Sequence, residues 1–544
     1  MKMLIIAGAL LALQTGHAQT GDSAGASAVS VQMKLVGAQP RDPIDPILLL
    51  DDRTAERFLD QATWGPTPAD IQYLQLKGFT KWLNEQFLMQ PSDLPDQPLL
   101  DASGKTNTDF TPLQRAFFEN AVNAPDQLRQ RVAFALSEIW VVSAVTVRPA
   151  YAYAPYYRLF LQNAFGNYRD IMKALTLSPA MGTYLNMANN NKGNPAKGTA
   201  ANENYARELM QLFTIGLTQL NPDGTPLLDG NGIPKPTYDQ AVVTNTARAL
   251  TGWTYPPAPG ATSKANNPAY YIGQMIPVET NHDMNSKVIV GGTFVPPNQT
   301  AEQDLDAVLD ALMAQPTMAP FISRQLIQHL VTSKPSPAYV QRVAGVFSDN
   351  GAGVAGDLRA VIKAILTDRE ARDGDSPSMP GYANFGHLRE PVMFLTDILR
   401  AFDAQLTPTS VIYNYATQLG QNLFFPTTVF SYFSPLYALD DGTPAPEFQI
   451  YTTQTATTRA NIVAAIIYGT LDKNTKLDYS EFLPYGGDIP TLLDHIAYVF
   501  LHHSMSPELQ QAATGAASAV TTPLARVQAA LYIVLTSSEY QVIQ

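Results

Sequence analysis

The chain has 544 residues with 35 Lys and Arg against 47 Asp and Glu, which gives a formal net charge of −12. This acidic balance argues against a protein that binds nucleic acid or another polyanion, because such binding depends on clustered Lys and Arg. Hydrophobic residues make up 45% of the chain, which excludes a disordered protein. No cysteine is present, so disulfides, thiol nucleophiles, iron–sulfur clusters and cysteine-bound zinc are excluded.

The first 18 residues have the features of a secretory signal peptide. An apolar run extends from Met3 to Leu13, and the small residues Gly16 and Ala18 stand at the −3 and −1 positions of a cleavage site. The run is shorter than the roughly 20 residues of a membrane span, so a retained anchor is the weaker alternative. We expect cleavage before Gln19 and export to the periplasm or the extracellular space.

The remaining chain is expected to consist of an arm and one domain. Residues 19–50 are rich in Gly, Ser and Ala and predict a flexible arm. Residues 51–544 show no break in composition that would mark a second domain. No later stretch is apolar for long enough to cross a bilayer, so we expect no transmembrane segment in the mature chain.

Helical patterns begin at residue 51. An acidic or hydroxyl side chain among residues 51–54 can cap a first helix through Ala62, and Thr67 with Pro68 is typical of the start of a second, which Gly78 is expected to end. Apolar residues at helical spacing predict further helices. These lie at 79–89, 126–143, 157–165, 168–176, 202–215, 238–251, 302–314, 319–331, 338–347, 358–366, 388–402, 453–467, 492–502 and 520–535.

Strand signals are few. The segment 220–238 contains glycine-bearing turns on either side of Leu227 and Leu228 and predicts a small hairpin between helices. A second β-like patch is KVIVGGTFV at 287–295. We therefore predict a mainly α fold, a large multi-helix single domain with one or two small β-hairpin insertions.

Several sequence blocks occur in order along nearly all of the mature chain. They are ATWGPTPADIQYLQLKGFTKWLNEQF at 62–87, RVAFALSEIWVVS at 131–143, FGNYRDIMKALTLSPAMGTYLN at 165–186, NENYARELMQLFTIG at 202–216, ARALTGW at 247–253, HDMNSKVIVGG at 282–292, FISRQLIQHLV at 321–331, REPVMFL at 389–395, PTTVFSYFSPLY at 426–437 and PEFQI at 446–450. Together they resemble an uncharacterised bacterial family known as domain-of-unknown-function family number 1800. The resemblance implies an exported, mostly helical protein, often encoded beside a sulfatase-like partner, and it implies no reaction.

The second of these blocks departs from the family pattern. Some members of the family that the chain resembles carry two histidines at the positions of Ser137 and Ile139. A metal site built on those histidines would lack both ligands in this chain. Glu138 remains between the two positions, within an apolar run.

The block at 202–216 provides the first candidate site. Glu203 and Arg207 are four residues apart, as are Asn204 and Glu208, so each pair shares a helix face. In a catalytic interpretation, Arg207 keeps one carboxylate ionised, the other glutamate is a general acid or base, and Asn202 helps to bind the substrate. In a structural interpretation, Asn202 caps the helix and Arg207 joins helices. Glu203 and Glu208 point roughly 140° apart on an ideal helix, so one small site cannot easily use both.

The second candidate site is the loop before the predicted patch at 287–295. His282 and Asp283 could position a proton-transfer group there, and Lys287 could bind an acidic substrate. Side-chain to backbone hydrogen bonds that fold the loop are the structural alternative. Glu203, Glu208, His282 and Asp283 are thus the predicted catalytic residues.

Two arginines within apolar helical segments complete the candidates. Arg324 and Arg389 are candidate ligand-binding residues, and ion pairs that join helices are the alternative. No metal ligands are predicted, because none of the histidines shows the HExxH spacing or an i,i+4 histidine pair. Metal binding would therefore require groups that are distant from one another in the sequence. The cofactor stays undetermined, because the sequence has no GxSxG elbow, no Walker loop and no GxGxxG after a predicted strand.

Two hypotheses of function follow from the sequence. The first is a binding or accessory protein of the cell envelope that acts with a sulfatase-like partner. The second is an enzyme with a carboxylate and histidine site that acts on an envelope polysaccharide. The enzyme hypothesis requires the predicted catalytic residues to converge on a pocket, whereas the accessory hypothesis does not.

Overall fold

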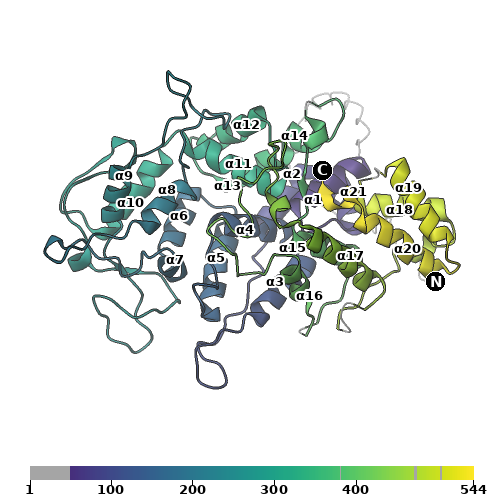
Figure 1. Ribbon diagram of the computed structural model, residues 1–544, viewed down its shortest axis with the longest axis horizontal. Helices are drawn as coiled ribbons and strands as arrows, with labels where there is room; N and C mark the ends of the chain where they lie inside the picture. The colour runs from purple at the N-terminus through teal and green to yellow at the C-terminus, as the bar shows by residue number, and fades with distance from the viewer. Residues whose placement is uncertain (1–49, 380, 408, 471–473, 503–504) are drawn as a thin grey trace, which may run out of the picture. The chain divides into compact units, whose positions relative to one another are not determined.

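A computed structural model describes residues 50–544 apart from 380, 408, 471–473 and 503–504, and Leu49–Gln544 form one compact unit. The predicted signal peptide lies outside the described residues, as does the predicted arm up to residue 49. Helices dominate the described part, and its β structure consists of two-stranded sheets (Figure 1). The mainly α fold class is therefore confirmed. None of the described helices combines the length and hydropathy that a bilayer crossing requires.

The first helices begin where the capping residues predict. Asp51 accepts a hydrogen bond from the Thr54 N–H, and Thr67 accepts one from the Asp70 N–H. Gly78 has a φ of 71° and interrupts the helical path, which resumes on its far side. The helices up to residue 249 are α1 (Asp52–Ala62), α2 (Pro68–Leu88), α3 (Thr111–Asn123), α4 (Gln127–Ile139), α5 (Tyr153–Asn163), α6 (Tyr168–Thr176), α7 (Pro179–Tyr184), α8 (Asn204–Gln211) and α9 (Gln240–Ala249).

The later helices are α10 (Ala301–Met313), α11 (Met318–Leu330), α12 (Pro337–Ser348), α13 (Leu358–Thr367), α14 (Arg369–Asp373), α15 (Pro391–Ala401), α16 (Ile412–Gln418), α17 (Thr453–Ile467), α18 (Ile489–Phe500), α19 (Pro507–Ser518), α20 (Pro523–Thr536) and α21 (Ser538–Gln541). Short 3-10 turns lie at Ala150–Ala152, Pro195–Lys197, Glu279–Asn281, Val290–Gly292, Tyr382–Asn384, Pro446–Ile450 and Leu483–Tyr485. Helices α3, α7, α14, α16, α19 and α21 lie outside the segments predicted from apolar periodicity.

Among the described residues, three two-stranded antiparallel sheets link segments of the chain. They pair β1 (Trp253–Thr254) with β2 (Ile276–Pro277), β3 (Lys287–Val288) with β4 (Phe294–Val295), and β5 (His387–Leu388) with β6 (Val542–Ile543). The β3–β4 hairpin confirms the β-like patch at 287–295. The segment 220–238 forms isolated bridges rather than strands, with Leu220 opposite Pro226 and Leu228 opposite Pro234.

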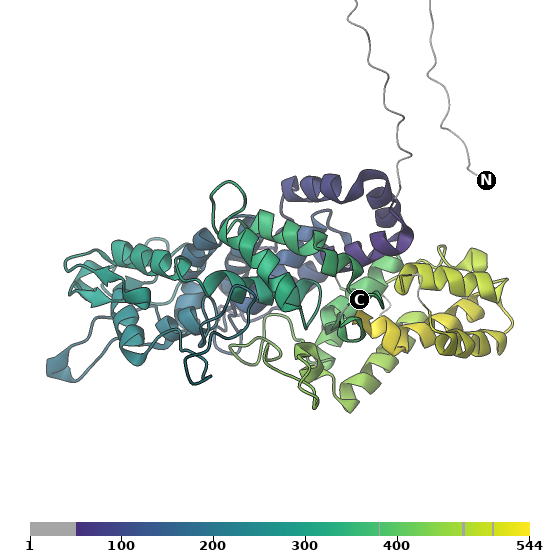
Figure 2. The same ribbon diagram turned by 90° about the horizontal axis from the view of Figure 1, so that it is seen from above.

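Helix α4 organises the region that carries the site. It packs against α1, α2, α3, α5 and α11. Trp64, between α1 and α2, contacts Phe117 of α3 and Phe134 of α4, with ring centroids 5.4 and 5.2 Å apart. Helices α17–α20 pack together on one side of these central helices, and α6, α8, α9 and α10 lie on the other (Figure 1; Figure 2). The ends of α4 and α11 and the start of α15 meet between the two groups.

Candidate functional site

Three ligand-type side chains from separate elements converge in the interior. Glu138 is the penultimate residue of α4, His329 is the penultimate residue of α11, and Glu390 immediately precedes α15. One ligand atom from each lies within 4.8 Å of the other two. His329 Nδ1 is 3.3 Å from Glu138 Oε2. Because Glu138 and Glu390 are buried and His329 is largely so, the three form an internal polar centre.

Gln421 orients the two carboxyl groups of this centre. Its Nε2 donates to Glu390 Oε2 at 2.5 Å and to Glu138 Oε1 at 3.3 Å. Its Oε1 accepts a hydrogen bond from the Val392 N–H in the first turn of α15. This bond fixes the amide so that its NH₂ group faces both glutamates. Such outer hydrogen bonds are typical of metal and catalytic centres.

Burial shifts the ionisation of all three groups. Burial raises the pKa of Glu138 to about 8, against the lowering effects of its hydrogen bond to Glu390 and of the Arg131 charge. Burial and the neighbouring Glu138 raise the pKa of Glu390 to about 8. Burial lowers the pKa of His329, so its imidazole favours the neutral form that binds metals. Perturbed groups gathered in this way are typical of functional sites.

Arg131 lies two turns before Glu138 on α4. Its guanidinium donates to the backbone oxygen of His329 at 2.9 Å and lies 5.5 Å from the centre of the Trp64 ring. Burial lowers the pKa of Arg131, and the negative charges of Glu390 and Glu138 oppose that shift. Nε and Nη1 of Arg131 have no hydrogen-bond partner among the described residues.

Glu447 is a further acidic residue close to the centre. Glu447 Oε2 accepts a hydrogen bond from the Ser333 hydroxyl at 3.0 Å, and Glu447 Oε1 is 3.4 Å from His387 Nδ1. The negative charge of Glu447 raises the pKa of both Glu138 and Glu390. Glu447 is therefore near enough to add to the negative potential of the centre.

The residues of the centre fit a divalent cation. Burial of Glu138 and Glu390 holds both carboxyl groups largely protonated near pH 7, and a bound cation would favour their ionised, metal-binding form. Two ligands of a tetrahedral site with bonds of about 2.1 Å are about 3.4 Å apart, close to the observed separation of His329 from Glu138. The C-terminal ends of α4 and α11 favour a cation, whereas the N-terminal end of α15 opposes it. Imidazole and carboxylate ligands suit zinc, manganese or iron.

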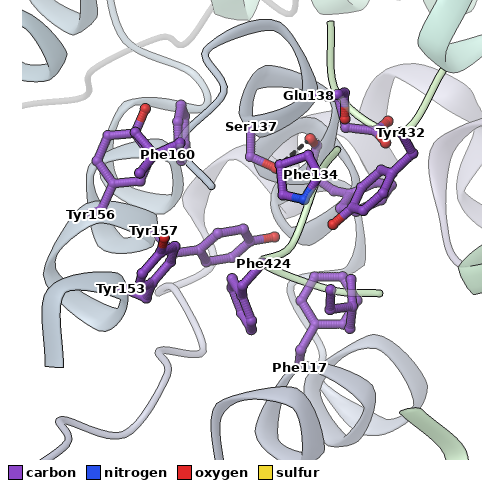
Figure 3. A pocket seen from close by; sticks show the side chains of 14 residues that line it. Phe117, Phe134, Ser137, Glu138, Tyr153, Tyr156, Tyr157, Phe160, Phe424 and Tyr432 are labelled. Carbon is purple, nitrogen blue, oxygen red and sulfur yellow. Dashed lines mark hydrogen bonds between the residues drawn. The ribbon is translucent and has the colours of Figure 1, made fainter. Parts of the chain in front are cut away.

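A cavity of about 40 Å³ lies beside Glu138 (Figure 3). Its walls come from α3, α4, α5 and the segment after α16, and most of the lining side chains are aromatic. Ser137, Phe424 and Tyr432 line it and are partly exposed, so the cavity lies close to the surface. The lining residues are Phe117, Phe134, Ser137, Glu138, Val142, Tyr153, Tyr156, Tyr157, Phe160, Leu423, Phe424, Pro426, Ser431 and Tyr432.

The predicted site on α8 consists of local pairs. Arg207 Nη2 donates to Glu203 Oε2 at 3.1 Å, as the i,i+4 spacing predicts. Glu203 Oε1 also accepts from the Thr244 hydroxyl of α9 at 2.7 Å. Hydrogen bonds from Thr244 and Gln240 and the Arg207 charge lower the pKa of Glu203, although partial burial opposes them. These contacts join α8 to α9.

Glu208 and Asn202 take no part in the hydrogen bond between Arg207 and Glu203. Partial burial raises the pKa of Glu208, and the nearby Arg207 charge opposes the shift. Asn202 Oδ1 accepts the Asn204 N–H at 2.9 Å, and the Asn202 backbone bonds to the side chain of Asn190. The N-cap of α8 is Glu203, so Asn202 lies one residue before the predicted cap position and bonds to the first residue of the helix.

His282 and Lys287 are sealed in the interior. His282 Nδ1 is 2.9 Å from the backbone oxygen of Thr251, and Nε2 is 3.1 Å from Asp304 Oδ2. Lys287 Nζ donates to the same Asp304 oxygen at 2.6 Å. All three side chains are inaccessible to solvent. Both ring nitrogens of His282 thus have a protein partner, which favours the alternative that these side chains stabilise the loop. The catalytic role of His282 stays a prediction.

Asp283 belongs to a separate ion pair. Arg248 of α9 donates to both of its carboxylate oxygens, at 2.8 and 3.2 Å. Burial opposes the ionisation of Asp283, but the hydrogen bonds from Arg248 and Asn285 and the nearby positive charges lower its pKa to about 2. Thr244 and Arg248 lie on one face of α9, so this face connects Glu203 with Asp283. The two predicted sites are neighbours across α9 and do not share a hydrogen bond between described residues.

The two candidate arginines differ. Arg389 donates to both Asp60 oxygens, at 2.5 and 2.7 Å, and to the Tyr540 backbone oxygen at 2.8 Å. It therefore joins α1 to the C-terminal segment, as the structural alternative proposes. Arg324 forms no ion pair with any described residue, and burial lowers its pKa. The ion pair expected of an arginine in an apolar helix is thus not found at Arg324.

Local spacing could not reveal the centre at Glu138, His329 and Glu390. Several other helices lie between these residues along the chain. None of the three is part of a metal-binding motif. One signal was present: Glu138 is a carboxylate within an apolar run. Its partners required knowledge of how α4, α11 and α15 pack.

Comparison with known proteins agrees with the sequence blocks. A family model described as "Protein of unknown function (DUF1800)" matches residues 57–542. No curated protein matches the chain, and no solved structure matches it. The family match covers nearly the whole chain. The chain therefore belongs to the DUF1800 family of proteins of unknown function.

Proposed function

We propose that this protein is an exported enzyme that uses a divalent cation held by Glu138, His329 and Glu390. The convergence of three ligand atoms from three separate elements is the observation that supports the proposal most directly. The fixed Gln421 amide and the adjacent cavity add to it. Three protein ligands leave a coordination position for water or substrate, as in catalytic rather than structural metal sites.

The chemistry proposed for the centre is hydrolysis. A bound divalent cation would polarise a substrate oxygen and favour the ionisation of water. Glu138, His329 and Glu390 would hold it, and Gln421 would keep the two carboxylates in place. An envelope polysaccharide is the proposed substrate class, because the predicted signal peptide would export the chain to the periplasm or the extracellular space, where such polysaccharides are accessible.

Metal binding tests the centre directly. We expect the metal-free protein to bind about one equivalent of zinc or manganese in calorimetry, with a matching metal content by mass spectrometry. Glu138→Gln and Glu390→Gln keep the side-chain shape and remove a charge, so each should weaken binding more than the roughly 10- to 100-fold caused by loss of an outer-shell partner. Equal affinity in wild type and both variants would contradict the proposal.

Glu203→Gln is a matched control for this experiment. It makes the same chemical change in the predicted catalytic set, and we expect metal affinity to stay unchanged. Activity of the metal-loaded protein on envelope polysaccharide then separates the two sites. Loss of activity in Glu203→Gln with metal binding intact would place the chemistry on α8.

A second candidate function is that of an accessory protein for a sulfatase-like partner. The segment 217–237 exposes Leu217, Leu228 and Ile233, with 57%, 49% and 60% of their surface accessible. Contiguous exposed apolar patches are typical of protein contacts, and we propose that these three side chains contribute to one. Co-purification from the native host should recover the partner, and Ile233→Asp should reduce its yield. Recovery that does not depend on Ile233 would contradict a role for this segment.

Export is tested on the full chain. Secretion with N-terminal sequencing should find a mature protein that begins at Gln19, because cleavage is expected after Ala18. A cell-associated protein that retains residues 1–18 would contradict this part of the proposal.

A further inference from the structure

We infer that the cavity beside Glu138 receives a short acyl group, such as an acetyl substituent, whose carbonyl oxygen is hydrogen-bonded by Tyr157. This inference rests on the proposed function, since it assigns a substrate class to the same centre. It narrows the substrate from a polysaccharide in general to an acylated one.

The volume of the cavity limits what can enter. A cavity of about 40 Å³ has room for roughly three water-sized groups, because one such group needs about 10–15 Å³. A sugar ring is several times larger than this space. An acetyl group has three non-hydrogen atoms and is of the right size. A polysaccharide would therefore remain outside and present only a small substituent.

Two phenols provide hydrogen-bond donors in the cavity. Tyr153 and Tyr157 are 2% and 4% exposed, and neither hydroxyl has a hydrogen-bond partner among the described residues. The neighbouring Tyr156 differs, because its hydroxyl donates to the Trp140 backbone oxygen at 2.7 Å. Figure 3 shows the Tyr157 side chain extending from α5 toward the side of the cavity that holds Tyr432. Buried donors without partners favour a ligand that brings an acceptor oxygen.

The apolar walls of the cavity suit the alkyl part of an acyl group. Phe117, Phe134, Phe160 and Phe424 provide an apolar surface suited to a methyl group. Glu138 borders both this cavity and the cluster with His329 and Glu390. An acyl group in the cavity would therefore place its carbonyl carbon near the polar centre.

The reaction would be deacylation by water. A water oxygen forms a bond to the carbonyl carbon, and the bond from that carbon to the ester oxygen breaks. A proton from the water passes to the departing oxygen. The products are a carboxylic acid and the free hydroxyl of the substrate, so no oxidant or reductant is needed.

Acetate binding to the zinc-loaded mature protein, residues 19–544, tests the inference without relying on turnover. We expect one acetate site in calorimetry, weakened about tenfold by Tyr157→Phe and unchanged by Tyr156→Phe, since the Tyr156 hydroxyl already donates to Trp140. Ser137→Leu places an alkyl group in the cavity at a partly exposed position and should abolish acetate binding while zinc affinity stays near wild type. With 4-nitrophenyl esters, hydrolysis should favour acetate over hexanoate.

The outcomes separate this inference from the proposed function. Zinc binding with no acetate site, or with equal acetate affinity in wild type, Tyr157→Phe and Ser137→Leu, would overturn the acyl inference and leave the metal centre standing. A crystal structure of the zinc–acetate complex with only water in the cavity would do the same. No zinc binding would overturn the proposed function, and the acyl inference would fall with it.

Discussion

Only 15% of the residues in the chain are charged, and the ion pair between Lys287 and Asp304 is one place where two of them are buried together. Lys287 Nζ lies 2.6 Å from Asp304 Oδ2, and His282 contacts the same oxygen. Lys287 also donates to the backbone oxygens of Asp283 and Asn285. The group therefore fixes the loop that leads into β3, and its residues are better placed to stabilise the fold than to meet a substrate.

Removing one partner should expose this role. Asp304→Ala leaves the Lys287 ammonium buried without its counter-charge, and breaking such a pair typically costs about 3–5 kcal/mol. We expect a loss of that size in the free energy of unfolding, measured with urea. The double variant Lys287→Met with Asp304→Leu should recover much of the loss, because both charges are absent. No difference between the single and double variants would contradict the account.

Asp283 provides a stability effect that depends on pH. Its pKa is lowered to about 2 from the ordinary 3.8, so the ionised form stabilises the folded state above pH 3.8 and this contribution disappears as the pH falls through 2. Asp283→Asn should reduce the free energy of unfolding by roughly 1–2 kcal/mol at pH 7, after allowance for solvent screening. The difference should narrow between pH 4 and pH 2. A constant difference over this range would show that Asp283 acts without its charge.

At the scale of elements, apolar periodicity predicted many of the helices in which apolar residues recur at helical spacing. The bounds 168–176 and 453–467 agree with α6 and α17 residue for residue. The predicted segments left out α19, which has few large apolar residues, and α3, although Leu113, Phe117 and Ala121 of α3 recur at helical spacing. Local patterns also predicted the Glu203–Arg207 pair, whereas the packing of α4 against α11 depends on contacts distant in sequence.

The turn after α9 offers a test at this scale. Gly252 has a φ of 88°, and a Cβ added there would lie 2.8 Å from His282 Cβ. Gly252→Ala should therefore lower the free energy of unfolding by about 2–4 kcal/mol, through backbone strain and overpacking. Gly230→Ala is the control, because a Cβ there meets no atom within 4 Å, and we expect a change of less than about 0.5 kcal/mol. Thermal or urea unfolding measures both.

At the scale of the whole molecule, helices from distant parts of the chain surround one polar centre. Glu138 comes from the first third of the chain, and Glu390 and Gln421 come from the last third. Pairing of β5 with β6 ties the segment before α15 to the C-terminus, and Arg389 ties the same segment to α1. The fold thus fixes the position of Glu390 from two sides. A rigid frame of this kind suits a site that needs defined ligand geometry.

An anomalous-scattering crystal structure of the protein soaked with zinc tests the central claim most directly. Our account predicts a single strong peak at the zinc edge, about 2.0–2.2 Å from a carboxylate oxygen of Glu138, a ring nitrogen of His329 and a carboxylate oxygen of Glu390. The peak should be absent from Glu138→Gln crystals soaked in the same way. The claim would be contradicted if zinc bound only at other positions and the Glu138 and Glu390 carboxyl groups remained hydrogen-bonded to each other.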